Sequence, residues 1–177
     1  MKKVILKYQL HDRDRLEDKL TSLDFDLSPI YWLHDRIYIP RGYKPGMNFP
    51  RMIMRTEMHA VDETPKYSLI LRRHIEDSGV DIVEETPITD YVATVNIILQ
   101  LGFKPAEEVS RRRQELTMGE KTMLYIDELD NHNNGCYLKL ETVVEEDASV
   151  EEVRNNLTKT LNDLGETDAI NKAYFEL

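Results

Sequence analysis

Lysine and arginine residues alternate with apolar residues in several short segments of this chain. The clearest of these segments are 51–58, 66–72 and 137–141. Successive residues of a β-strand point to opposite faces, so each segment would gather its charges on one face and its apolar residues on the other. Guanidinium and ammonium groups that converge in this way bind phosphate oxygens, and arginine does so through paired hydrogen bonds. The pattern therefore predicts either a wet, charged surface or an anion-binding tunnel.

The bland alternative is a solvated sheet face, on which Arg51, Arg55 and Arg72 form surface ion pairs with residues such as Glu57. Each such pair is worth only about 0–1 kcal/mol. Within 111–113, only Arg111 and Arg113 can share one face of a strand, so Arg112 is expected to point outward. The five histidines show no metal-ligand spacing, and we assign no role to His59 or His74.

Composition limits the partners of the chain. A net charge of −10 argues against a nucleic-acid partner or an anionic membrane surface, because both need a positive stripe. The single cysteine, Cys136, allows no internal disulfide, and the first residues lack an apolar stretch long enough for a signal peptide. We therefore expect a cytoplasmic protein without a membrane span.

Eight strands and three helices are predicted in the order strand, helix, four strands, helix, three strands, helix. The strands are expected at 4–10, 30–39, 50–60, 66–75, 80–86, 106–118, 121–130 and 136–145. Asp12, Thr89 and Ser149 are the expected caps of the helices, which reach Leu23, Leu101 and Leu164. This order predicts one α+β domain over 1–177, with a large sheet of mainly antiparallel neighbours.

Several segments of the charged face resemble one known family. They are Leu101-Gly102-Phe103, the segment 109–113 with its alternating arginines, Asp127-Glu128-Leu129, the segment 135–141 after a glycine turn, Arg55, Arg72, and Glu85 just before Thr86-Pro87. In order and type they are similar to the CYTH domains, also called triphosphate tunnel metalloenzymes, which include class IV adenylyl cyclases and thiamine triphosphatases. The resemblance implies an antiparallel eight-stranded tunnel-like β-barrel with helices packed outside.

The resemblance also implies a site. Lys7, Arg55, Arg72, Arg111 and Arg113 would hold the phosphates of a small-molecule triphosphate or nucleotide. Glu85, Asp127 and Glu141 would bind Mg²⁺ or Mn²⁺, whose ligands are typically carboxylate and phosphate oxygens. No catalytic residue is assigned, and a homodimer is expected only at the level of the family.

The chain departs from the family pattern at the carboxylates. The motif Glu-x-Glu-x-Lys of the first strand reads Lys3, Ile5 and Lys7 here, Lys139 replaces one of the paired glutamates, and Val83 replaces another acidic residue. The first hypothesis is a metal-dependent phosphohydrolase or adenylyl cyclase acting on an organic or inorganic triphosphate. The alternative is a non-catalytic nucleotide or polyphosphate sensor that has lost metal ligands. In a third hypothesis the charged face is merely solvated and belongs to an interaction domain.

Overall fold

The computed structural model describes residues 1–44, 49–61, 63–75, 80–130, 135–145 and 148–165. Their helices and strands follow the predicted order. The elements are β1 (Lys2–Gln9), α1 (Arg13–Ser22), β2 (Tyr31–Pro40), β3 (Arg51–Met58), β4 (Lys66–Ile75), β5 (Val80–Ile88), α2 (Tyr91–Gln100), β6 (Phe103–Met118), β7 (Thr122–Leu129), β8 (Cys136–Val144) and α3 (Val150–Leu164).

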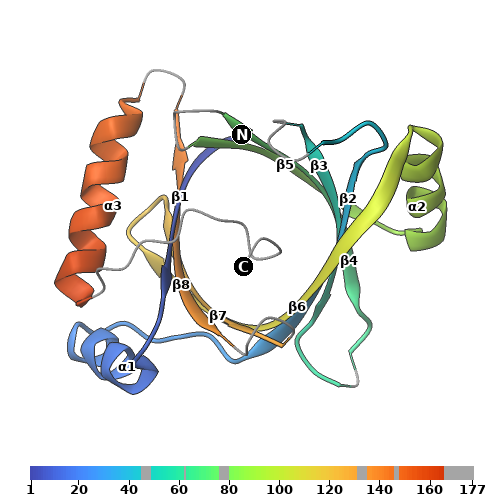
Figure 1. Ribbon diagram of the computed structural model, residues 1–177. Helices are drawn as coiled ribbons and strands as arrows, with labels where there is room; N and C mark the ends of the chain where they lie inside the picture. Colours follow the sequence, from blue (N-terminus) through green and yellow to red (C-terminus); the bar gives the residue numbers. More distant parts are fainter. Residues whose placement is uncertain (45–48, 62, 76–79, 131–134, 146–147, 166–177) are drawn as a thin grey trace.

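The strands close into a barrel in the order β1-β5-β4-β3-β2-β6-β7-β8 (Figure 1). Every neighbouring pair is antiparallel. The helices lie outside the barrel, with α1 and α3 on one side and α2 on the other (Figure 1). The predicted α+β architecture, an eight-stranded antiparallel barrel with external helices, is confirmed.

The largest apolar core lies between the barrel wall and the helices α1 and α3. Leu16 and Leu20 of α1 and Leu161 of α3 are almost completely buried against outward-facing residues of β1, β7 and β8, such as Leu124 and Leu140. Since strand side chains alternate, this packing leaves the other face of the same strands for the lumen.

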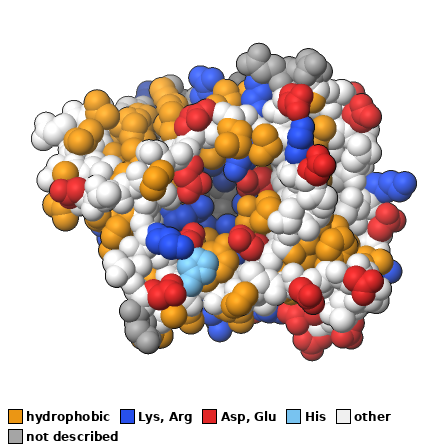
Figure 2. Space-filling model, turned by 180° about the vertical axis from the view of Figure 1, so that it is seen from behind, with side chains coloured by type: hydrophobic (Ala, Val, Ile, Leu, Met, Phe, Trp, Pro, Cys, Tyr) orange, Lys and Arg blue, Asp and Glu red, His pale blue; other side chains and the backbone are white. Residues whose placement is uncertain are grey.

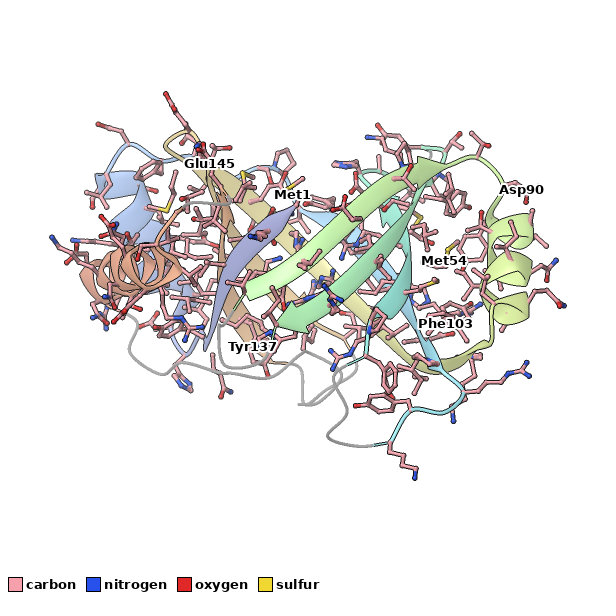
Figure 3. The ribbon with its side chains drawn as sticks, turned by 90° about the horizontal axis from the view of Figure 1, so that it is seen from above. Met1, Met54, Asp90, Phe103, Tyr137 and Glu145 are labelled. Carbon is pink, nitrogen blue, oxygen red and sulfur yellow. The ribbon has the colours of Figure 1, made fainter. Side chains whose placement is uncertain are left out.

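A smaller core lies under α2. Ile98 of α2 packs with Tyr38 and Met54, all of them buried, and Met54 lies on the side of the barrel that faces α2 (Figure 3). The alternation in β3 therefore works as predicted: Met54 packs outward under a helix, and Arg55 points into the barrel.

Two of the three predicted helix N-caps are confirmed. Asp12 and Ser149 cap α1 and α3 as predicted, each accepting a hydrogen bond from a backbone N–H of the first turn. The cap of α2 was wrong: Asp90, not Thr89, accepts the hydrogen bond from the Ala93 N–H. The reason is that β5 continues through Pro87 to Ile88, past the short stretch over which it pairs with β1. A proline is tolerated where a strand has a partner on one side only.

Within the described part of the chain, none of the helices has the length and apolar character needed to cross a membrane.

Candidate functional site

The charged faces of the strands meet inside the barrel and line one cavity. Its charged lining residues are Lys7, Arg51, Arg55, Arg72, Arg111, Arg113 and Lys139, together with the carboxylate of Asp35. Seen from the side opposite to Figure 1, the molecule is hollowed, and Lys and Arg side chains lie within the hollow (Figure 2). Seven cations against one carboxylate give this lining a positive charge in a chain whose net charge is −10.

Asp35 of β2 lies between two arginines from neighbouring strands. Arg55 donates from Nε and Nη2 to its two oxygens at 2.8 and 2.9 Å, and Arg111 donates from Nη2 at 2.8 Å. Burial alone would raise the pKa of Asp35, but the charges and hydrogen bonds of Arg111 and Arg55 outweigh it and hold the pKa far below its usual range. Asp35 therefore stays ionised and fixes both guanidinium groups at the cavity wall.

Asp127 of β7 is likewise held by arginines, in this case Arg113 and Arg111 of the neighbouring strand β6. It is completely buried, and Arg113 donates to its two oxygens at 2.5 and 2.6 Å. Arg111 Nε lies 3.7 Å from Asp127 Oδ2, so Arg111 joins the two aspartates. Burial would raise the pKa of Asp127, but the charge and hydrogen bonds of Arg113, followed by the charge of Arg111, lower it well below the usual range.

Asp81 of β5 is the third carboxylate that is held by basic side chains, here Arg72 and His74. Arg72 donates to its Oδ2 from Nε and Nη2, and the Nδ1 of His74 lies 2.9 Å from its Oδ1. Burial opposes ionisation here too, but Arg72 and His74 lower the pKa of Asp81. Like Asp35 and Asp127, Asp81 orients cations of the barrel wall.

Glu141 of β8 is held by two ammonium groups. Lys3 Nζ lies 2.5 Å from its Oε1, and Lys139 Nζ lies 2.9 Å from its Oε2. Burial lowers the pKa of Lys139 to about 8, although Glu141 partly opposes this shift. Lys139 Nζ also lies over the ring of Tyr125, 4.3 Å from its centroid. The cluster of one carboxylate and two lysines carries a net positive charge while Lys139 is protonated.

These ion pairs fill much of the lumen. The remaining cavity measures about 70 Å³, which is room for only a few water molecules. Typical pockets for small molecules are larger, roughly 300–1,000 Å³. A polyanion that enters the lumen must therefore compete with the internal carboxylates for the cations or move the long side chains aside.

The structure brings the five predicted phosphate ligands together. Lys7, Arg55, Arg72, Arg111 and Arg113 all line the same cavity, although their role in binding phosphate stays a prediction. Arg112 points away from it, as predicted, with 49% of its side chain exposed beside Glu128.

The three predicted metal ligands are not gathered in this way. Asp127 and Glu141 are held by cations, and Glu85 accepts a hydrogen bond from the Ser68 hydroxyl at 2.8 Å. Among the residues that the structure describes, no group of three His, Cys, Asp or Glu side chains is placed to hold a metal ion. A divalent cation would have to displace lysine or arginine groups from Asp127 and Glu141, so the donors in this arrangement do not fit Mg²⁺ or Mn²⁺.

The sequence reasoning missed Asp35 and Asp81, and it placed Arg51 on the charged face without assigning it to the phosphate ligands. A signal for Asp35 was present, because it alternates with Leu33 and Ile37 and so shares their inward face. A carboxylate in an otherwise apolar alternation indicates a buried partner of opposite charge.

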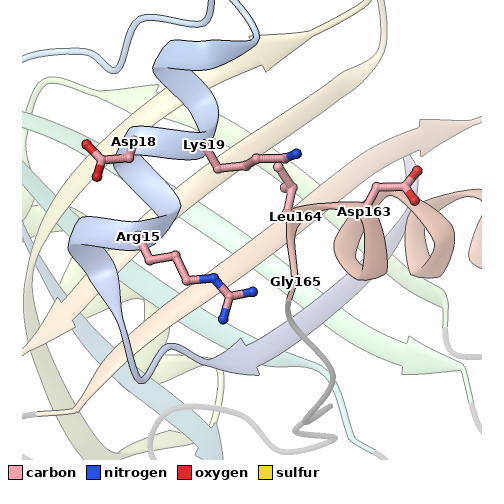
Figure 4. Close-up of a pocket in the computed structure, with 6 residues that line it drawn as sticks. All are labelled: Arg15, Asp18, Lys19, Asp163, Leu164 and Gly165. Carbon is pink, nitrogen blue, oxygen red and sulfur yellow. The ribbon is translucent and has the colours of Figure 1, made fainter.

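A second hollow lies outside the barrel, where α1 approaches the end of α3 (Figure 4). Its lining residues are Arg15, Asp18, Lys19, Asp163, Leu164 and Gly165. Two cations face two carboxylates there, so this hollow lacks the positive excess of the lumen.

Neither a protein-family model nor a curated protein sequence matches this chain. Its fold is similar to that of solved structures. The PH1819 protein from Pyrococcus horikoshii is 20% identical with a TM-score of 0.84, and the match covers 98% of this chain and 96% of that protein. A candidate adenylate cyclase from Vibrio parahaemolyticus is 15% identical with a TM-score of 0.80, covering 98% and 95%. HpAC1, a candidate adenylyl cyclase from Hippeastrum described as having a dominant triphosphatase activity, is 15% identical with a TM-score of 0.66, covering 99% and 94%. At these identities the likeness shows a common barrel fold.

Proposed function

We propose that this chain, which has the barrel fold of the CYTH domains, binds the phosphate groups of an organic or inorganic triphosphate inside the barrel. The observation that carries the proposal is the convergence of seven lysine and arginine residues, from five of the strands, on one cavity. A chain with net charge −10 has no general reason to collect cations in its interior. A polyphosphate is the ligand whose charge matches this lining.

The geometry favours binding through direct hydrogen bonds. Guanidinium groups offer paired donors to phosphate oxygens, and charges inside a walled lumen are screened less than those on a surface. Asp35 and Asp127 hold Arg55 and Arg113 through their Nε and Nη2 atoms. These carboxylates hold the arginines at the cavity wall, and they also occupy donors for which a phosphate has to compete.

Lys3 and Lys139 supply positive charge beside Glu141 without a metal. A triphosphate that reaches this part of the lumen meets ammonium groups rather than a chelated cation. The proposed ligand is therefore the free polyanion, and binding does not require Mg²⁺ or Mn²⁺.

The internal carboxylates are poorly suited to proton abstraction. A useful general base has a pKa near the working pH, whereas the pKa values of Asp35, Asp127 and Glu141 are held well below their usual range. Binding or sensing of a triphosphate is thus the function that these residues support best. The cytoplasm is its proposed site of action, because the only cysteine in the sequence, Cys136, can form no internal disulfide.

The second candidate is a metal-dependent phosphohydrolase or adenylyl cyclase. It is favoured by the descriptions of the Vibrio parahaemolyticus and Hippeastrum proteins, which have the same fold. Phosphoryl transfer needs little beyond positioning and charge stabilisation, which a metal ion would supply when bound. In this candidate the lumen cations position the triphosphate.

Calorimetric titration with tripolyphosphate, in EDTA and separately in Mg²⁺ or Mn²⁺, tests the proposal. Arg72→Met should weaken binding about tenfold or more, whereas Arg73→Met, which removes the exposed neighbour on the same strand, should not. Phosphate release and cyclic-nucleotide formation from tripolyphosphate, ATP and thiamine triphosphate are measured in parallel. Binding in EDTA without turnover supports the first candidate, and metal-dependent turnover supports the second. No binding of any triphosphate would exclude both.

A further inference from the structure

One mouth of the barrel carries a pair of stacked rings. Tyr31, at the start of β2, and His59, directly after β3, have ring centroids 4.6 Å apart and an interplanar angle of 14°. Tyr31 is buried, whereas 42% of the His59 side chain is exposed. The histidine ring therefore rests on the tyrosine and still presents much of its surface to solvent.

Both rings are fixed by carboxylates. The Tyr31 hydroxyl donates to Glu115 Oε2 at 2.6 Å, and His59 Nε2 lies 2.7 Å from Glu57 Oε1. A ring that is held by a buried neighbour and a hydrogen bond offers a flat surface at little cost in entropy. Glu57 remains partly exposed beside this surface, where it can accept hydrogen bonds from a ligand.

The stacked pair adjoins the cationic cavity. Tyr31 lies directly across from Arg113 in the pairing of β2 with β6, and Arg113 lines the cavity. Side chains at such positions stand about 5 Å apart at Cβ. A molecule whose phosphates lie among the lumen cations thus has its other end within reach of His59.

We propose that Tyr31 and His59 form a stacking platform for the heteroaromatic ring of an organic triphosphate, and that Glu57 accepts hydrogen bonds from the amino groups of that ring. The inference rests on the proposed triphosphate function and adds the ligand class: a nucleoside triphosphate with an amino-bearing base, rather than inorganic polyphosphate. Aromatic stacking accepts the flat face of any base, and the carboxylate selects rings with N–H donors.

The test compares ATP with inorganic tripolyphosphate, which carries the phosphates without a base. His59→Ala should weaken ATP binding about tenfold and leave tripolyphosphate binding unchanged. His59→Phe keeps a flat ring and should retain most of the ATP affinity. The matched control is His34→Ala, which removes a similarly exposed histidine beside Ser110 and Glu108. This variant should change the affinity for neither ligand.

The role of the carboxylate is tested separately. Glu57→Gln should weaken the binding of ATP more than the binding of inosine triphosphate, since inosine triphosphate lacks the exocyclic amino group. If His59→Ala weakens both ATP and tripolyphosphate equally, or weakens neither, the platform is overturned while triphosphate binding stands. If the wild-type protein binds neither ligand, the proposed function itself fails and the platform fails with it.

Discussion

Lys3 and Glu141 form an ion pair inside the barrel, with Lys3 Nζ 2.5 Å from Glu141 Oε1. Lys139 reaches the other oxygen of the same carboxylate. In the family that the sequence resembles, glutamates occupy the positions of both lysines. Relative to the family pattern, two carboxylates are replaced by two ammonium groups, so the local charge is more positive.

Restoring carboxylates should restore a metal site. In the double variant Lys3→Glu/Lys139→Glu, three carboxylates would face one another, and we expect Mn²⁺ to bind at least tenfold more tightly than to the wild type. Mn²⁺ should also raise the melting temperature of the variant, because a ligand that binds only the folded state stabilises it. The control is Lys2→Glu/Lys121→Glu, which changes the net charge equally outside the lumen. Equal Mn²⁺ affinity in all three proteins would contradict this interpretation of the lysines.

Triphosphate binding should weaken as the pH rises through about 8. Burial lowers the pKa of Lys139 to about 8, so the free protein begins to lose this charge there. A bound polyanion favours the protonated form, so binding above this pH requires proton uptake and should weaken by up to about tenfold per pH unit. Calorimetry in buffers of different ionisation enthalpy measures the proton uptake.

Two variants separate Lys139 from the titration of the phosphates themselves. Lys139→Met should remove most of the decline in affinity, while Lys121→Met, at an exposed lysine, should keep it. An unchanged pH profile in Lys139→Met would show that another group is responsible.

Asp35→Asn should bind tripolyphosphate more tightly and fold less stably. Asp35 is the only carboxylate among the residues that line the described cavity, and it occupies donors of Arg55 and Arg111. Without its charge these donors are available to phosphate, but the folded protein loses about 3 kcal/mol because Arg55 and Arg111 lose the charge of a shared, buried hydrogen-bond partner.

Calorimetry and urea unfolding measure the two effects of Asp35→Asn independently. Asp18→Asn, on the exposed side of α1, is the control for net charge. Weaker binding in Asp35→Asn would mean that Asp35 serves the ligand by orienting the arginines rather than competing with it.

Acid should destabilise the barrel progressively below about pH 5. The pKa values of Asp35 and Asp127 are lower in the folded chain than in the unfolded chain. Their stabilisation is therefore complete above the unfolded pKa of about 4 and is lost as the pH falls toward the folded values, by roughly 2 kcal/mol for each carboxylate. Urea unfolding at a series of pH values gives this slope.

Asp127→Asn should reduce the acid dependence, since one of the carboxylates with a lowered pKa then no longer titrates. Glu145→Gln, whose exposed ion pair with Lys121 contributes little, should leave it unchanged. If the free energy of unfolding of Asp127→Asn falls as steeply with acid as that of the wild type, groups other than Asp127 cause the acid sensitivity.

The strands were predictable because their charged and apolar residues alternate so regularly, whereas the closure of the sheet into a barrel was expected only from the resemblance to the CYTH domains. Arg51, Ile53 and Arg55 face inward and Met54 faces outward, as the period of two requires. The strand at 66–75 was predicted with both ends correct. The end of β5 was not, because Pro87 reads as a break in the sequence and only the pairing with β4 shows that the strand continues.

The site was predictable for its cations and less so for their partners. Arginine spacing along one strand indicates which side chains share a face. It does not indicate that Asp35 of β2 will meet Arg55 of one neighbouring strand and Arg111 of the other, since that depends on the registers on both sides. The Tyr31–His59 stack depends on register in the same way, because the two residues lie at the ends of adjacent strands.

The closed barrel separates two tasks that most folds combine in the same residues. Outward-facing residues such as Leu124 and Leu140 pack against the helices, while the charged residues of the cavity face inward beside apolar residues such as Ile37 and Ile53. Because each strand pairs with two neighbours, the backbone hydrogen bonds of the barrel do not depend on which side chains face the lumen. Such a scaffold allows a carboxylate on the lumen side to be exchanged for a lysine, as at Lys3 and Lys139, without changing the residues that pack against the helices.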